Sequence, residues 1–185
     1  MNTGVVSRRY AKALLAYVKL AKKEDKVYEE VKALAHNFVG IADLRHAVEN
    51  PVLDAQTKLK LLQKAAGGDG VSKELMRFFT LVLGEKREKF LQFMTWSYID
   101  LYREDKNILI GELTTAVPSP KLADYLSKTM SKKMNGARIQ LVTKVDPNLI
   151  GGYTIELAGY RLDASVANQL KRVEQQFIAK NRRIV

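Results

Sequence analysis

Few residues of this chain have the types and the spacing that catalysis requires. Asp146, Glu156 and Asp163 could act as paired carboxylates, the arrangement used in general acid–base chemistry. Each of them also fits a structural position: Asp146 in a turn, Glu156 at an exposed strand position and Asp163 at a helix cap. We favour the structural interpretation for all three, so no catalytic carboxylate pair is predicted.

Two histidines and a glycine cluster are the other candidates for a ligand site. His36 and His46 fall in different predicted helices, and the sequence pairs neither with further metal ligands. Residues 67–70 (GGDG) follow a helix rather than a strand, so we expect a connection there and not a dinucleotide-binding turn. No glycine precedes Lys-Ser or Lys-Thr, so a Walker-type phosphate loop is missing. We expect no catalytic residue, no metal site and no cofactor.

The composition indicates a folded protein with an excess of positive charge. The 185 residues contain no cysteine, which excludes disulfides, thiolate metal sites and cysteine nucleophiles. Arg8, Arg9, Lys12 and Lys19 interrupt the amino-terminal stretch, so we expect neither a signal peptide nor direct membrane insertion there. The net charge is +11, and residues 106–185 carry 13 Lys+Arg against 6 Asp+Glu, a net charge of +7. Such a balance suits phosphates, acidic lipids or acidic protein partners.

Apolar residues at helical spacing dominate the first 105 residues. This spacing predicts six amphipathic helices, at about residues 5–22, 25–40, 41–48, 54–66, 72–83 and 87–104. Asp25 and Asp54 are expected to cap the second and the fourth of them. Six helices joined by short connections predict an independent bundle.

The apolar period changes from helix to strand near residues 105–107. Strand patterns follow at about residues 108–117, 139–145, 153–157 and 160–162, with one helix beginning at Pro120 and another capped by Asp163. The expected fold class is therefore α + α/β. Residues 1–105 form a six-helix bundle, and residues 106–185 form a small α/β domain with a short four-stranded sheet and two helices.

The helix predicted at residues 72–83 is hydrophobic nearly all round. Such a helix either lies at the centre of a core or has a second face meant for a partner, and the pattern leaves both alternatives open. With a free second face, the accessible edge would consist of Met76, Phe79 and Leu83, and the inward face of Leu75, Phe78 and Val82. That edge would suit an inserted amphipathic helix, and the first helix of the chain could form the other wall of the groove.

Taken together, these segments resemble the delta subunit of bacterial F-type ATP synthase, the counterpart of the mitochondrial oligomycin sensitivity-conferring protein. The resemblance covers essentially the whole chain. It is carried by residues 9–14 (RYAKAL), Asn50-Pro51, residues 79–87, and most specifically by Val145-Asp146, Leu149, Gly151-Gly152, Ile155-Glu156 and Asp163-x-Ser165 at the family's spacing.

The resemblance implies a non-catalytic stator connector of a proton-translocating enzyme. Such a subunit links the α/β catalytic head to the peripheral stalk, so that the head does not rotate with the central shaft. The implied partners are the N-terminal helix of an α subunit and the C-terminal end of the peripheral stalk b subunits. One copy per complex is expected, attached peripherally at the cytoplasmic face of the bacterial inner membrane, with no nucleic acid bound.

The resemblance also implies which residues make these contacts. The groove for the α-subunit helix would use Tyr10, Ala13, Leu14 and Tyr17 of the first helix and Met76, Phe79 and Leu83 of the fifth. Arg9 would pair with acidic groups of the head. The stalk would contact the last helix through Val166, Leu170, Val173 and Phe177, next to the basic residues Lys171, Arg172, Lys180, Arg182 and Arg183. A solvated basic face is the alternative interpretation of that helix.

Two other functional classes stay open on sequence grounds. A basic RNA- or DNA-binding protein would explain the charge of the second domain, although only Tyr153 and Tyr160 could offer sheet aromatics for base stacking. An enzyme with an unrecognised site is the other class, and no residue supports it.

Overall fold

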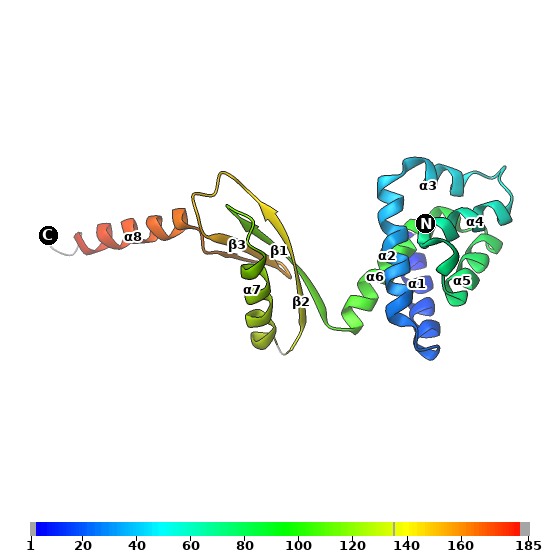
Figure 1. Cartoon of the computed structure of the whole chain (residues 1–185), viewed down its shortest axis with the longest axis horizontal. Coiled ribbons are helices and arrows are strands. Elements are labelled where there is room, and N and C mark those ends of the chain that lie inside the picture. Colours follow the sequence, from blue (N-terminus) through cyan, green and yellow to red (C-terminus); the bar gives the residue numbers. More distant parts are fainter. Residues whose placement is uncertain (1–2, 135, 182–185) are drawn as a thin grey trace. The chain divides into compact units, whose positions relative to one another are not determined.

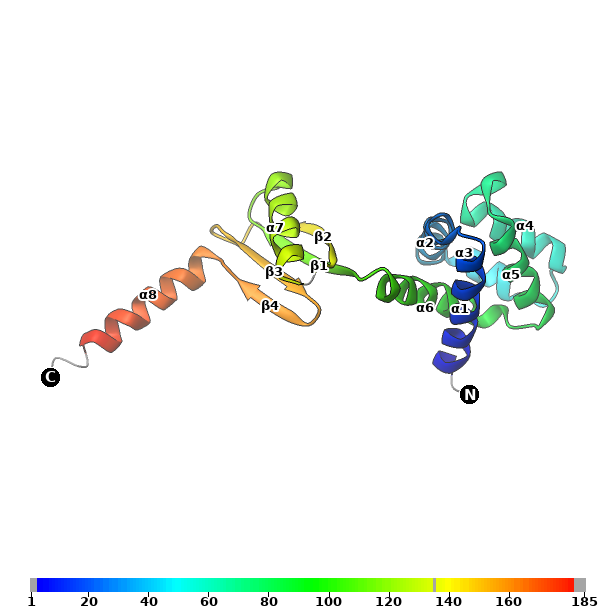
Figure 2. The same cartoon turned by 90° about the horizontal axis from the view of Figure 1, so that it is seen from below.

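The computed structural model describes residues 3–134 and 136–181, and the chain divides into two compact units, Met1–Asp105 and Lys106–Val185 (Figure 1 and Figure 2). Among the described residues, the first unit holds six α-helices and two 3-10 turns, and the second holds a four-stranded sheet with two α-helices. This arrangement confirms the predicted fold class, a six-helix bundle followed by a small α/β domain.

The first unit packs its helices around a common core. They are α1 (Thr3–Leu20), α2 (Glu24–Gly40), α3 (Ala42–Glu49), α4 (Ala55–Ala66), α5 (Lys73–Gly84) and α6 (Leu91–Asp105), with 3-10 turns at Gly68–Gly70 and Glu88–Phe90. Helix α6 packs against α1 and α2, and α4 packs against α2 and α5. The fully buried side chains include Val18, Leu34, Leu62, Phe79 and Tyr98, one from each of five helices. Burying a large apolar side chain contributes roughly 1.5–3 kcal/mol, so this core is what holds the bundle together.

The outer side of α6 carries the only tryptophan in the sequence. The Trp96 ring packs edge-to-face against the Phe93 ring, with centroids 6.1 Å apart, and both side chains are exposed. Trp96 also lines a pocket of about 460 Å³ together with His36 and Val39 of α2. His36 is exposed there, and His46 is exposed on α3, so the two histidines lie on different helices as expected.

The predicted helix caps of the first unit are only half right. Asp54 accepts a hydrogen bond from the Thr57 N–H at 3.1 Å, which confirms it as the cap of α4. Hydrogen bonding from the side chain and the backbone of Thr57 lowers the pKa of the Asp54 carboxyl. The prediction that Asp25 caps α2 is wrong, because α2 begins at Glu24 and Asp25 lies within the helix. The Asp25 carboxylate instead accepts a hydrogen bond from the Tyr102 hydroxyl of α6 at 2.6 Å. No local sequence pattern could reveal a partner that lies 77 residues away.

The second unit builds a mixed sheet from β1 (Ile108–Thr115), β2 (Arg138–Val145), β3 (Tyr153–Leu157) and β4 (Tyr160–Asp163), with helices α7 (Pro120–Lys133) and α8 (Val166–Asn181). The strand order is β2-β1-β3-β4. Strands β1 and β2 are parallel because α7 forms the crossover between them, whereas β3 lies antiparallel to both β1 and β4. The two interior strands of the sheet are therefore β1 and β3.

Helix α7 covers one face of this sheet (Figure 1). The buried cluster consists of Leu113, Leu126, Ile155 and Leu157, and the side chains packed around it are Leu109, Leu122, Ala123, Met130, Met134, Ile139, Leu141 and Tyr153. The opposite face carries ion pairs between Lys144 and Glu112 and between Arg161 and Glu156, both at 3.6 Å. This division into apolar and charged faces is the physical origin of the period-two pattern.

Gly151 and Gly152 fix the start of α8. The Gly151 carbonyl accepts a hydrogen bond from the Val166 N–H at 3.0 Å, and Gly152 has a φ of 81°. A Cβ atom at Gly152 would overlap the carbonyl oxygen of Ala164 and would lie 2.9 Å from the Cα of Ser165. Only glycine combines this backbone conformation with this close approach.

The predicted cap of α8 is also wrong. Ser165 is the N-cap, because its Oγ accepts a hydrogen bond from the Asn168 N–H at 3.3 Å. Asp163 forms the turn just ahead of it and accepts a hydrogen bond from the Ser165 N–H at 2.9 Å. Hydrogen bonding from the side chain and the backbone of Ser165 lowers the pKa of the Asp163 carboxyl. Beyond this turn, the side chains from Gln169 to Ile178 are all exposed.

Gly152→Ala is expected to destabilise the second unit by at least about 2 kcal/mol, because alanine meets both a positive φ and a steric overlap. Urea unfolding followed by circular dichroism would measure the loss. Gly159→Ala is the matched control, since Gly159 has a φ of 82° but open space around the added Cβ. It should cost only about 1 kcal/mol. Equal losses in the two variants would show that the overlap with Ala164 does not matter.

Candidate functional site

A groove between α1 and α5 forms a largely apolar recess on the first unit. It has a volume of about 520 Å³, and its lining residues are Arg9, Tyr10, Ala13, Leu14 and Tyr17 from α1 and Arg77, Phe78 and Leu81 from α5. The structure therefore brings together all five of the α1 residues that were predicted to bind a partner. Their binding of a partner remains a prediction.

Helix α1 can serve both the core and the groove because it carries two neighbouring apolar stripes. Ala11 and Val18 are fully buried in the bundle. Tyr10, Ala13 and Tyr17 recur three or four residues apart and lie on the adjacent, more accessible side. Folding thus buries one stripe and leaves the other partly accessible along the groove.

The groove is lined by none of the three α5 residues predicted to form its accessible edge, Met76, Phe79 and Leu83. Phe79 is 0% exposed and Leu83 is 8% exposed, so neither forms an accessible edge. Leu83 faces a different pocket beside the ion pair of Lys58 and Glu88, whose charged atoms lie 2.7 Å apart. Met76 is half-buried and does not line the groove.

The α5 wall of the groove is formed by residues one or two positions away in the sequence from the predicted ones. Phe78 is 9% exposed and therefore buried, as expected, but it also lines the groove, and Leu81 lies beside it with 53% of its surface exposed. The α5 side chains with 0% exposure are Leu75, Phe79 and Val82, spaced i, i+4 and i+7. The predicted inward stripe with Phe78 is spaced i, i+3 and i+7, which satisfies the same helical period. Adjacent phenylalanines therefore made the two orientations indistinguishable from the sequence.

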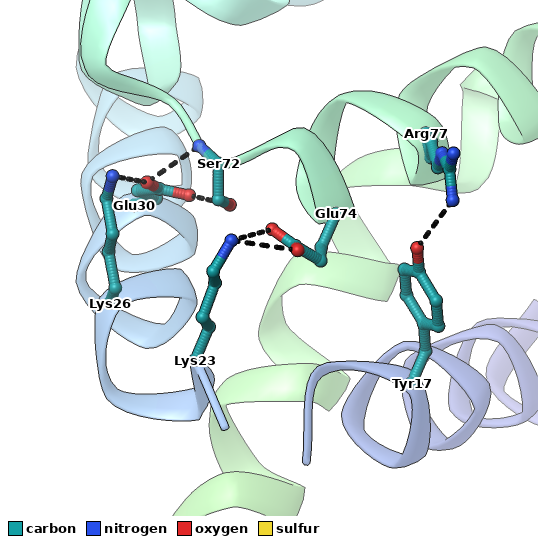
Figure 3. A network of polar contacts seen from close by, with 7 residues as sticks. All are labelled: Tyr17, Lys23, Lys26, Glu30, Ser72, Glu74 and Arg77. Atoms are coloured by element: carbon teal, nitrogen blue, oxygen red, sulfur yellow. Dashed lines mark hydrogen bonds and ion pairs between the residues drawn. The ribbon is translucent and has the colours of Figure 1, made fainter. Parts of the chain in front are cut away.

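Tyrosine–arginine contacts connect the two sides of the groove. The Arg77 guanidinium donates a hydrogen bond to the Tyr17 hydroxyl at 3.0 Å, which joins α5 to α1 (Figure 3). The Arg87 guanidinium lies 5.4 Å from the centroid of the Tyr10 ring, a cation–π contact. Tyr10 also packs edge-to-face against Phe78, with centroids 6.5 Å apart.

A polar network holds the N-terminal end of α5 against α2 (Figure 3). The Glu30 carboxylate accepts hydrogen bonds from the Ser72 N–H at 2.9 Å and from the Ser72 hydroxyl at 2.5 Å. Lys23 donates to both carboxylate oxygens of Glu74, and this hydrogen bonding lowers the pKa of Glu74. The Glu74 contact is therefore retained at neutral pH and is lost as the pH falls through the lowered pKa. These contacts fix the α5 wall on the bundle.

Helix α8 provides a second unpartnered apolar surface, on the other unit. Val166, Leu170, Val173 and Phe177 fall on one stripe, and all four side chains are exposed. Lys171 and Arg172 lie beside the stripe and are exposed as well. The side chain of Lys180 and the residues Arg182 and Arg183, also predicted to be basic neighbours, lie outside the described residues.

The residues first considered for catalysis have structural partners. Asp146 accepts a hydrogen bond from the Asn148 N–H at 2.9 Å in the turn after β2, while Glu156 and Asp163 make the contacts described above. In residues 3–134 and 136–181, no three His, Cys, Asp or Glu side chains come together in a way that could hold a metal ion. Gly67 ends α4 with a φ of 137°, which accounts for the first residue of the glycine cluster.

The sheet offers little for base stacking. Tyr153 packs into the core beneath α7, which leaves Tyr160 as the exposed one of the two sheet tyrosines. Stacking of successive bases needs several accessible aromatic faces, so this surface gives the nucleic-acid alternative no support. Among the described helices, none combines the length and the apolar character that a bilayer span requires.

Comparisons with known proteins agree over nearly the full length of the chain. The family model described as ATP synthase delta (OSCP) subunit matches residues 6–177. ATP synthase subunit delta of Phocaeicola vulgatus is 57% identical over 186 aligned positions, and that of Bacteroides thetaiotaomicron is 46% identical, each covering 100% of both chains. A chain from the mitochondrial ATP synthase hexamer of Toxoplasma gondii shares the fold, with a TM-score of 0.61, 21% identity, and 93% of this chain and 97% of that chain covered. This chain belongs to the family of ATP synthase delta (OSCP) subunits.

Proposed function

We propose that this chain is the non-catalytic stator connector of a proton-translocating F-type ATP synthase. It would link the α/β catalytic head to the peripheral stalk, so that the head does not rotate with the central shaft. The observation that carries this proposal is the presence of one unpartnered apolar surface on each unit, the α1–α5 groove and the α8 stripe. A connector needs two such surfaces, whereas a catalyst needs a reactive constellation.

The occupant proposed for the groove is the N-terminal helix of an α subunit. Tyr10 and Tyr17 lie seven residues apart on α1, which corresponds to about 10.5 Å or two helical turns. A two-turn recess with apolar walls suits a short amphipathic helix that anchors residues at i, i+3 or i+4, and i+7. Phe78 and Leu81 would then replace Met76, Phe79 and Leu83 as the α5 contacts.

The occupant proposed for the α8 stripe is the C-terminal end of the peripheral stalk b subunits. Leu170, Val173 and Phe177 contribute little to folding of the second unit, because their side chains remain exposed. Helix-to-helix packing would bury this stripe, and the adjacent Lys171 and Arg172 would favour an acidic face on the partner.

Two separate docking surfaces on one chain suit the mechanical task of a stator. Once the groove is occupied, the α8 surface is held near the stalk at high effective concentration, which strengthens the whole connection without new contacts. A single copy would join one head to one stalk. The stalk, rather than this chain, would provide attachment at the cytoplasmic face of the membrane.

Titration of the full chain with a fluorescent peptide copying the α-subunit N-terminal helix would test the proposal. We expect saturable binding with a Kd on the order of 10 µM or tighter, measured by anisotropy. Val52→Asp changes an exposed apolar residue that does not line the groove, so it should leave the affinity unchanged. Absence of binding at ten times that concentration would overturn the docking role of the groove.

A further inference from the structure

The groove carries positive charge on both of its walls. Its charged lining residues are Arg9 on α1 and Arg77 on α5, and both side chains are exposed. The other lining residues are tyrosine, phenylalanine, alanine and leucine, so an occupant would meet an apolar floor with two cations at its rim.

The nearby carboxylates are already bound to other cations. Glu74 lies one turn before Arg77 on α5, but Lys23 donates to its two oxygens at 3.0 and 3.2 Å. Glu104 lies 3.7 Å from the guanidinium of Arg8 rather than of Arg9. Within the described parts of the chain, neither Arg9 nor Arg77 forms an ion pair with a carboxylate.

Tyr17 positions one of these cations. The contact that holds Arg77 across the groove is a hydrogen bond to the neutral Tyr17 hydroxyl. A guanidinium group has five N–H donors in a planar fork, so Arg77 keeps donors for a carboxylate while Tyr17 holds it in place. A carboxylate would also gain a charge-assisted bond, which is about twice as strong as a neutral one.

The cations lie towards opposite ends of the groove. Arg77 contacts Tyr17, while Arg87 lies over the Tyr10 ring and Arg9 precedes Tyr10 in the chain. Because the two tyrosines are about 10.5 Å apart along α1, a helix lying along the groove spans the distance between the cations in seven residues.

We propose that the groove selects its occupant by charge as well as by apolar shape. It accepts an amphipathic helix whose apolar stripe is flanked by carboxylates about seven residues apart, one meeting Arg77 and the other meeting Arg9. This inference rests on the proposed docking role of the groove and adds the chemistry of the partner.

The same rim disfavours a second copy of this chain as the occupant. Helix α8 has an exposed apolar stripe of suitable length, but Lys171 and Arg172 flank it. Its cations would face Arg9 and Arg77, and like charges across an interface weaken binding strongly. Charge thus separates the acidic partner helix from the basic helix of the chain itself.

Two forms of the α-subunit N-terminal peptide test the proposal, the native peptide and a peptide with every Asp and Glu replaced by Asn and Gln. At low salt, the full chain should bind the native peptide about tenfold more tightly. The Arg9→Gln, Arg77→Gln double variant should reduce this preference to about twofold or less. At about 1 M salt, where the Debye length is about 3 Å, the preference of the unmodified chain should also shrink.

A matched control removes the same net charge elsewhere on the bundle. The Lys32→Gln, Arg45→Gln double variant changes exposed cations that do not line the groove, and it should retain the tenfold preference. Equal binding of the two peptides would overturn charge selection and would leave the docking role intact. Binding of neither peptide would overturn both. The assignment would also be refuted if the Arg9→Gln, Arg77→Gln variant still preferred the native peptide over the neutralised one. It would equally be refuted if the native peptide had no carboxylates about seven residues apart.

Discussion

Phe79→Asp is expected to unfold the helical bundle, and Leu81→Asp is expected to leave it folded. Phe79 is fully buried, so the substitution removes a large apolar side chain and places a carboxylate in the core. Removing a buried phenylalanine costs about 3–5 kcal/mol, and burying an unpaired charge costs several more. That loss approaches the whole stability of a typical domain, about 5–15 kcal/mol. Circular dichroism of the two variants would measure the difference in helix content.

Leu81→Asp tests the groove without testing the core. Its side chain is 53% exposed on the groove wall, so aspartate remains solvated there and the helix content should not change. Affinity for the α-subunit peptide should fall at least about tenfold, because the substitution removes apolar contact area from the proposed site. A folded Phe79→Asp variant that has lost peptide binding would instead show that the sequence-based orientation of α5 was correct.

Leu170→Asp should weaken binding to the stalk strongly while leaving the second unit folded. Leu170 is 61% exposed on α8, so it contributes little to the core, but it lies in the middle of the proposed docking stripe. A central apolar anchor of an interface typically contributes 2 kcal/mol or more, so affinity should fall at least about 30-fold. Co-sedimentation or titration with a C-terminal fragment of the b subunits would measure this loss.

Gln175→Asp is the matched control for the stalk interface. Gln175 is an exposed residue of the same helix, and it lies two positions after Val173, on the other side of α8 from the stripe. Gln175→Asp adds the same negative charge as Leu170→Asp, but its affinity for the b-subunit fragment should be close to that of the unmodified chain. Similar losses in the two variants would indicate that added negative charge, and not the apolar stripe, controls the affinity.

The helices and strands could be predicted from local sequence patterns, namely the spacing of apolar residues and the residues at turns. Strands of the second unit have one face against α7 and one in solvent, so Leu113 and Ile155 stand in alternation with charged neighbours. The two-residue gap at Ala158 and Gly159 predicts the β3–β4 hairpin, and both residues have the positive φ of a type I′ turn. The strand order could not be predicted in this way, because no local sequence pattern indicates that β2 and β3 lie on either side of β1.

The details of the candidate site depend on long-range contacts and on small rotations. The α1 residues of the groove were expected from the family resemblance, and the apolar pattern of α1 by itself does not separate them from its buried side. The α5 wall was not predicted correctly, because rotation by a single residue exchanges Phe78 for Phe79 without changing the helical period. Arg77 was missed for a related reason: its partner Tyr17 is 60 residues away, and an isolated arginine on a helix carries no signal of such a contact.

The place of the only tryptophan gives the first unit a spectroscopic signal of its own. Trp96 belongs to α6 of the first unit and packs against Phe93 at the surface, whereas the second unit has tyrosine and phenylalanine as its only aromatic residues. Tryptophan emission therefore follows unfolding of the bundle alone, while far-ultraviolet ellipticity follows both units. Denaturation monitored by the two signals on the same sample would show whether the units melt together or in succession, with no label attached to the chain.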